Sequence, residues 1–127
     1  MSTLMKDVAF GRILCAVDLS SRSRQTVEAA AMLAAAHDAE LRLFYVQQPG
    51  EQGDVEHVIA SLFALAPNVG RRVRVSAAVT AGDLASEIQR HATLFSADLI
   101  VLGVDAAASV AAHARCPVIS LPERMAP

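Results

Sequence analysis

Residues that could hold a small ligand follow two apolar runs of this sequence. Asp18 ends the run ILCAVD, and the polar turn LSSRS comes directly after it. The turn supplies hydroxyl groups, arginines and the start of a helix, whose free N–H groups attract anions. Gly103 ends a second run, ADLIVLG, and a hydroxyl residue, Ser109, follows. The candidate ligand-binding residues are therefore Asp18, Ser20, Ser21, Gly103 and Ser109.

Both parts of the first cluster also have a structural interpretation. Asp18 could contact a nucleoside or ribose, or it could close a buried strand by hydrogen bonding to the next turn, as Asp often does. The serine turn could hold a small anion, or Ser20, Ser21 or Ser23 could cap the first turn of the following helix. The sequence leaves these alternatives open.

Other kinds of chemistry find no support in the sequence. No serine stands in a nucleophile elbow and no Gly-rich Walker loop is present, so we expect no catalytic residue, no enzyme and no cofactor. The histidines share no metal-ligand spacing, which predicts no metal site and places most of them at the surface or at helix ends. Cys15 and Cys116 lack a Cys-x-x-Cys spacing and are predicted to be buried structural thiols. The histidines are His37, His57, His91 and His113.

The composition predicts one self-sufficient domain. The chain has 127 residues, of which 54% are hydrophobic and 19% charged, so it can bury a core without metal or disulfides. We expect the domain to span residues 1–127, with its core at about 12–122. Its 11 basic and 13 acidic side chains give a net charge of −2, which disfavours nucleic acid despite a local cluster at Arg71, Arg72 and Arg74.

The first twelve residues, MSTLMKDVAFGR, contain no continuous apolar stretch. A secretory signal needs an apolar core of several residues, and a membrane span needs a much longer one. We therefore expect a cytoplasmic protein with no membrane partner.

Apolar β-rich runs alternate along the chain with segments of helical periodicity. Because parallel strands need a crossover, this order predicts a doubly wound, five-stranded parallel α/β sheet with helices on both faces. Arg72 and Arg74 alternate with Val73 and Val75, which favours an edge position for that strand. Asp38, after the first helix, suits a left-handed turn. Strands are expected at 13–18, 39–47, 71–79, 97–103 and within 116–122, and helices at 22–37, 55–65, 84–95 and 106–114.

The predicted topology brings the candidate residues to one edge of the sheet. In open α/β sheets, ligands bind beyond the carboxyl ends of the strands, at the point where strand order reverses. The turns to compare are those that follow the first and fourth strands, at residues 18–24 and 103–109. A phosphoacceptor receiver domain shares this architecture, but its acidic residue after the third strand is missing at Val79 to Ala81. An ATP pyrophosphatase would need Ser-Gly-Gly in place of the DLSSRS turn.

The segments ILCAVDLS, AELRLFYV, AGDLASEI, ADLIVLG and CPVISLP resemble, in this order, the landmarks of universal stress protein domains. The resemblance covers residues 13–121. It implies strand order 3-2-1-4-5, a nucleotide crevice between the first and fourth strands, a role in stress response and a homodimer formed through the last strand. The implied dimer residues are Val118, Ile119, Ser120 and Leu121.

ATP-binding members of that family carry an acidic residue at the end of the first strand, which Asp18 matches. They also carry a Gly-x2-Gly-x9-Gly-Ser/Thr pattern around the phosphates, and here this pattern is absent. Counted from Gly103, the required glycines and hydroxyl residue are replaced by Ala106, Cys116 and Pro117.

Alignment from the other end of the segment gives the same result. It leaves Ala108 in place of the last glycine, with Ser109 as the hydroxyl residue. Glycines let backbone N–H groups approach phosphate oxygens, and Asp105 adds a negative charge near them, so ATP binding is disfavoured.

We interpret the chain as a universal stress protein-like domain of a non-ATP-binding type that acts through homodimerisation and contacts with an unknown protein partner. The alternative is a module that binds a small ligand, such as AMP or a nucleoside, in the residual crevice at the ends of the first and fourth strands.

Overall fold

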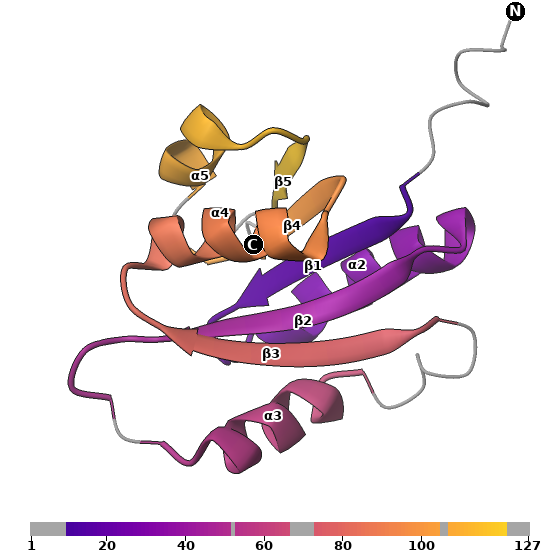
Figure 1. Ribbon diagram of the computed structural model, residues 1–127. Coiled ribbons are helices and arrows are strands. Elements are labelled where there is room, and N and C mark those ends of the chain that lie inside the picture. Colours follow the sequence, from indigo (N-terminus) through magenta and orange to yellow (C-terminus); the bar gives the residue numbers. More distant parts are fainter. Residues whose placement is uncertain (1–9, 52, 67–72, 105–106, 122–127) are drawn as a thin grey trace, which may run out of the picture.

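The computed structural model describes residues 10–51, 53–66, 73–104 and 107–121. Within these ranges five strands and four helices alternate along the chain (Figure 1). This order agrees with the sequence prediction. The elements are β1 (Arg12–Val17), α2 (Ser23–His37), β2 (Glu40–Gln47), α3 (Val55–Ala64), β3 (Val75–Ala81), α4 (Leu84–Phe95), β4 (Leu99–Gly103), α5 (Ala107–His113) and β5 (Val118–Ser120).

The described strands form one parallel sheet in the order β3-β2-β1-β4-β5, which confirms the expected topology. β1 lies at the centre, where Ile13 pairs with Leu41 of β2 and with Leu99 of β4. β3 and β5 are the two edge strands. Strand order reverses between β2 and β4 around β1, so the carboxyl end of β1 is the topological switch point.

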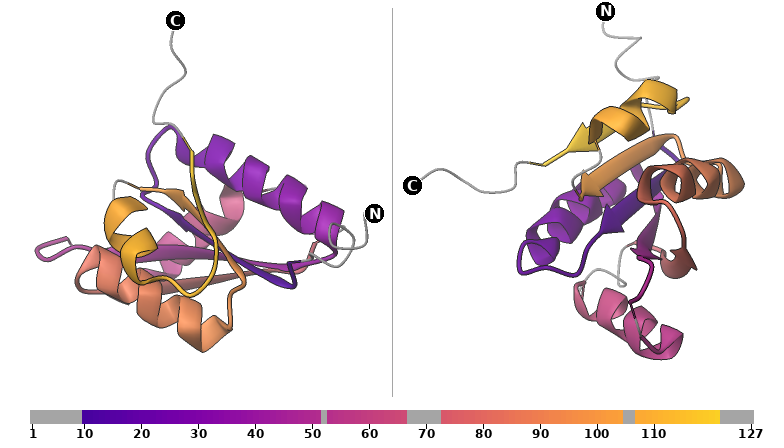
Figure 2. Two further views of the ribbon diagram at one scale, coloured as in Figure 1. Left: turned by 90° about the horizontal axis from the view of Figure 1, so that it is seen from above. Right: turned by 90° about the vertical axis from the view of Figure 1, so that its left-hand side faces the viewer.

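Helices cover both faces of the sheet, and each face has its own apolar cluster (Figure 2). α2 and α3 pack on one face, where Val27, Ala30 and Ala34 have no exposed surface. These small side chains allow α2 to approach the strands closely. α4 and α5 pack on the other face, through Ile88 and Val110. None of the described helices is long and apolar enough to cross a membrane.

Local signals in the sequence set several helix ends. The Asp83 carboxylate accepts a hydrogen bond from the Ser86 N–H at 3.0 Å and caps α4, as predicted. The carboxylate of Asp54 accepts from the Glu56 N–H and caps α3 in the same way. Asp38 ends α2 in the left-handed conformation, with φ of 54°, which its short polar side chain tolerates.

Two local predictions are wrong. The N-cap residue of α2 is Arg22 in a helical conformation, and no side chain at that position makes a cap bond. The Ser20 hydroxyl accepts from the Arg22 N–H at 3.3 Å, one residue before the helix, and the Ser23 N–H donates to the Ser20 carbonyl. β3 begins at Val75 and ends at Ala81, later than the predicted 71–79. Exposed Arg74 precedes the strand, and residues 71 and 72 lie outside the described residues. The bounds of β3 differ from the prediction because Val75 and Val79 pack against the apolar cluster under α3.

Candidate functional site

A small cavity lies beyond the carboxyl ends of β1, β2 and β4, where the crevice rule places a ligand. Its volume is about 280 Å³. The residues that line it come from the ends of these strands, from the segments just after β2 and β4, and from the start of α4. They are Val17, Asp18, Tyr45, Val46, Gln48, Leu84 and Val104.

Asp18 is tied to the turn that follows β1. Its Oδ1 accepts hydrogen bonds from the Ser20 N–H at 3.0 Å and from the Ser23 hydroxyl at 3.3 Å. Partial burial acts to raise the pKa of Asp18, but the hydrogen bonds from Ser20 and Ser23 outweigh it and hold the pKa below its usual value. The carboxylate is therefore ionised at neutral pH, and one of its oxygens is already used in holding the turn.

The turn also stores backbone strain beside Asp18. Leu19 adopts a positive φ of 61°, which is unfavourable for a leucine. Its side chain packs against the core cluster under α2. Burial of this side chain and the two hydrogen bonds to Asp18 hold the turn in shape. Asp18 therefore has the structural role that the sequence offered as one of its two interpretations.

Gly103 has a packing role at the end of β4, under α2. It ends β4 opposite Val17 of β1. A Cβ atom at this position would lie 2.7 Å from Oγ1 and 3.0 Å from Cβ of Thr26 on α2. Glycine therefore lets α2 sit close to the sheet, and the next residue, Val104, is the one that lines the cavity.

The candidate residues are only partly brought together. Ser20 lies beside Asp18 in the same turn, and Gly103 is adjacent through the pairing of β1 with β4. Ser21 is exposed and does not line the cavity. Ser109 is exposed on α5, and its main-chain carbonyl accepts from the Gln89 side chain at 3.2 Å. The structure thus assembles the β1 half of the expected crevice without Ser109.

Tyr45 and Glu51 belong to this site although the sequence analysis did not select them. The Tyr45 hydroxyl donates to the Glu51 carboxylate, which also accepts from the Gln48 N–H. Burial, together with the Glu51 carboxylate, raises the pKa of Tyr45 to about 12. The hydrogen bond from Tyr45 in turn holds the pKa of Glu51 below its usual value. In the sequence, a tyrosine near the end of a strand followed by an acidic turn could have indicated this pair.

The charge around the cavity is negative. Asp18 lines it and Glu51 is bonded to its wall, while none of the described residues that line it is a lysine or arginine. Across the described part of the chain, no group of three or more His, Cys, Asp or Glu side chains could hold a metal ion. The arrangement suits a small neutral or cationic group better than a polyphosphate.

The two cysteines differ in environment. Cys15 is fully buried in the sheet, and burial raises the pKa of its thiol to about 12, as expected for a structural residue. Cys116 is only partly buried, so its prediction as a buried thiol is wrong. It stands just before the short edge strand β5 and packs against the apolar cluster on the α4 face.

The chain matches the model of the universal stress protein family over residues 9–122. This match spans every element of the sheet and both turns of the crevice. The chain belongs to the universal stress protein family. No curated protein sequence matches it significantly.

Solved universal stress proteins share its fold. A universal stress protein in complex with cAMP aligns with a TM-score of 0.76 and 21% identity, over 90% of this chain and 98% of that chain. A protein of the family from Burkholderia pseudomallei aligns with a TM-score of 0.71 and 29% identity, over 88% and 96%. The universal stress protein from Archaeoglobus fulgidus in complex with dAMP aligns with a TM-score of 0.72 and 19% identity, over 91% and 100%.

Proposed function

We propose that this universal stress protein domain does not bind ATP and acts without catalysis in stress response, through homodimerisation and contacts with a protein partner. The connection from β4 to α5 carries the proposal. β4 ends at Gly103 and α5 begins at Ala107, which leaves only Val104, Asp105 and Ala106 between them. A phosphate loop needs successive backbone N–H groups that can approach oxygen atoms, usually at glycines. This connection contains no glycine.

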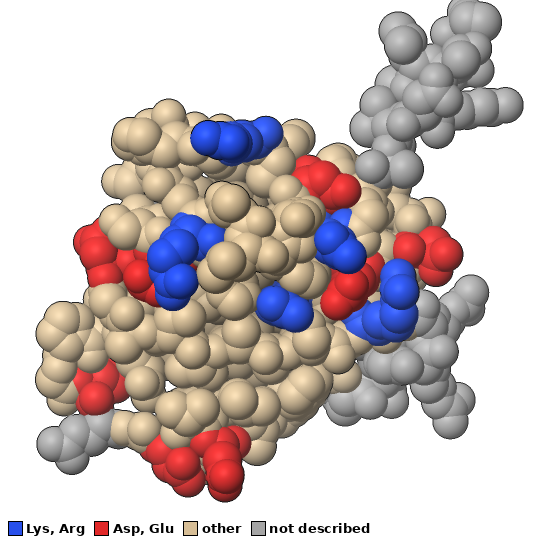
Figure 3. Space-filling model, in the orientation of Figure 1, with Lys and Arg blue, Asp and Glu red and all other residues tan. Residues whose placement is uncertain are grey.

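The cavity itself supports the same proposal. Its volume of about 280 Å³ is below the roughly 300–1,000 Å³ of common small-molecule pockets. The Glu51 carboxylate, which is bonded to Tyr45 in the cavity wall, would repel the negative phosphates of ATP, whereas Asp18 is a feature that ATP-binding members share. The face of the molecule in Figure 3 carries basic and acidic side chains side by side, with no continuous basic surface for a polyanion.

The β5 edge is the proposed dimer surface. Among the described strands, β5 pairs only with β4, and the residues that flank it bond to β4 from the Ile100 N–H to the Pro117 carbonyl and from the Leu121 N–H to the Leu102 carbonyl. Ile119 has 38% of its surface exposed on this outer strand. Two copies of β5 related by a twofold axis can pair antiparallel through the free edge. Sedimentation analysis of the purified protein tests this, and a strict monomer at high concentration would contradict it.

Two free cysteines are in keeping with the cytoplasmic location that we propose, since reducing compartments keep thiols free.

The second candidate function is binding of a nucleoside or monophosphate in the crevice cavity. The observation that favours it is the cavity beside Asp18, together with relatives solved with cAMP and dAMP. Titration of isotope-labelled protein with AMP and cAMP tests it by NMR. Shifts at Asp18 and Tyr45 that weaken in Asp18→Ala would favour this function, and unchanged spectra would exclude it.

A further inference from the structure

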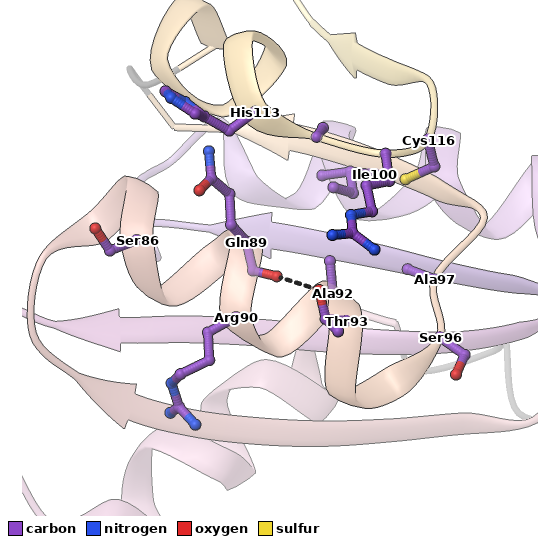
Figure 4. Close-up of a pocket in the computed structure, with 12 residues that line it drawn as sticks. Ser86, Gln89, Arg90, Ala92, Thr93, Ser96, Ala97, Ile100, His113 and Cys116 are labelled. Atoms are coloured by element: carbon purple, nitrogen blue, oxygen red, sulfur yellow. Dashed lines mark hydrogen bonds between the residues drawn. The ribbon is translucent and has the colours of Figure 1, made fainter.

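A second and larger cavity lies on the opposite side of α4 from the edge strand β3. It is a groove of about 510 Å³ between α4, α5 and the connection that leads into β5 (Figure 4). This volume lies within the common range for small-molecule pockets, whereas the crevice cavity falls below it. The apolar part of its lining comes from Ala92, Ala97, Ile100 and Ala114.

The walls of the groove are fixed by contacts on both sides. Val110 of α5 is completely buried and anchors that helix in the core. The Gln89 side chain reaches from α4 and donates to the carbonyls of Ser109 at 3.2 Å and Val110 at 3.5 Å. Figure 4 shows Gln89 directed from α4 toward α5. The groove therefore exists before any ligand enters.

One cation in the groove has no partner among the described residues. Arg90 is paired with Glu87 at 2.7 Å and points away from α5 in Figure 4. Arg115 also lines the groove, and it forms no hydrogen bond or ion pair with another described residue. Arg115 is exposed, so its fork of N–H donors can pair with the oxygens of an anion that enters the groove.

No negative charge in the lining competes for that guanidinium. None of the described residues that line the groove is an aspartate or glutamate. The Cys116 thiol stays neutral, because burial and the nearby Asp98 carboxylate raise its pKa. Asp98 itself accepts hydrogen bonds from the backbone N–H groups of Gly11 at 2.8 Å and Arg12 at 3.1 Å. It is thus engaged at the start of β1.

We propose that this groove binds a small organic anion. The anionic oxygens, of a carboxylate or a phosphate monoester, pair with Arg115, and a compact apolar body packs on Ala92, Ala97 and Ile100. The site is separate from the crevice at Asp18, and it differs from it in size and in charge. It does not depend on the proposed dimer.

Three matched probes test the site by NMR on isotope-labelled, full-length protein. Phenylacetate and phenyl phosphate carry the two anionic groups, and phenylacetamide is a neutral isostere of the first. We expect the anions to shift the amide signals of Gln89 and of residues 114–116, with one anion group preferred. Phenylacetamide should bind at least about tenfold more weakly than phenylacetate, since a charge-assisted hydrogen bond is lost.

Two variants complete the experiment. Arg115→Gln removes the unpaired cation from an exposed position and should weaken anion binding about tenfold without unfolding the domain. Arg74→Gln, an exposed arginine outside the groove, should leave it unchanged. The proposal is overturned if none of the probes shifts these signals, if the amide binds as well as the anions, if the shifts map to Asp18 and Tyr45, or if both variants behave alike. Repeating the titration with the Ile119→Asp variant, which is designed to be monomeric, shows whether anion binding in the groove is independent of dimerisation.

Discussion

The guanidinium Nη1 of Arg42 lies 3.3 Å from Nε2 of His91, so a charged side chain of β2 and a histidine of α4 meet beneath the helix. The Arg42 Nε–H also donates to the Ser76 hydroxyl on β3 at 3.0 Å, and the guanidinium stacks over the Phe95 ring. His91 is stacked on Phe44, with ring centroids 4.4 Å apart. Arg42 can donate to Nε2 only while His91 is neutral.

Replacing Arg42 by alanine should destabilise the domain. The change removes a hydrogen bond to Ser76, the contact with His91 and a cation–π contact with Phe95. We expect a loss of about 1–3 kcal/mol in the free energy of unfolding, measured by urea denaturation. Arg24→Ala, an exposed arginine on α2, serves as the control and should change it little. Equal stability of the two variants would mean that the cluster under α4 is not structural.

The stability of the domain should fall as His91 becomes protonated. Burial lowers the pKa of His91 below 6.5, and the charges of Arg42 and Arg90 add to this, while Glu87 opposes it. In the unfolded chain the histidine takes up a proton near 6.5, so its contribution is complete above that pH and is lost as the pH falls through the lower folded pKa.

Melting temperatures at about pH 7.5 and pH 5.5 measure this effect. In His91→Phe, which keeps an aromatic ring against Phe44 but cannot titrate, the difference between the two pH values should shrink. An unchanged difference would assign the pH dependence to other groups.

Gly103→Ala should destabilise the domain through contact with Thr26. The new Cβ would stand 2.7 Å from Oγ1, so α2 must move away from β4, at a cost of about 1–3 kcal/mol. The penalty should be smaller in a Thr26→Ala background, because Oγ1 and Cγ2 are then gone. Gly11→Ala is the control, since its Cβ would meet nothing closer than 3.5 Å. A loss of stability no larger than that of the control would contradict the packing role of Gly103.

Ile119→Asp should shift the protein from dimer to monomer, because the charge would be buried in the proposed β5 pairing. Leu94→Asp is the matched control, since it removes another exposed aliphatic side chain, 66% exposed on α4. Sedimentation equilibrium distinguishes the two variants. Dimerisation that survives Ile119→Asp would place the interface elsewhere.

The topology was predictable because apolar runs of strand length alternate with segments of helical periodicity. Short signals such as Asp83 before α4 and Asp38 after α2 were also read correctly, since each acts through its own backbone neighbours. The start of α2 and the bounds of β3 were not. The serines after β1 bond within the turn at Asp18, and β3 is set by packing of Val75 and Val79 against the core.

The site was predictable in position but not in detail. The end of β1 follows from topology alone, and Asp18 stands there. The neighbours of a side chain come from elements distant in sequence, so neither the Tyr45–Glu51 bond nor the burial of His91 could be derived from spacing. The role of Gly103 likewise depends on its distance from Thr26 across two elements. The groove at Arg115 arises only when α4, α5 and the β5 connection are assembled.

Calorimetric titration of the purified protein with Mg·ATP tests the central claim most directly, because it examines the short β4–α5 connection without any substitution. We expect no heat of binding at protein concentrations where an affinity of about 10 μM would be plain. Saturable one-site binding of ATP with micromolar affinity would contradict the claim that this universal stress protein domain lacks a working phosphate loop.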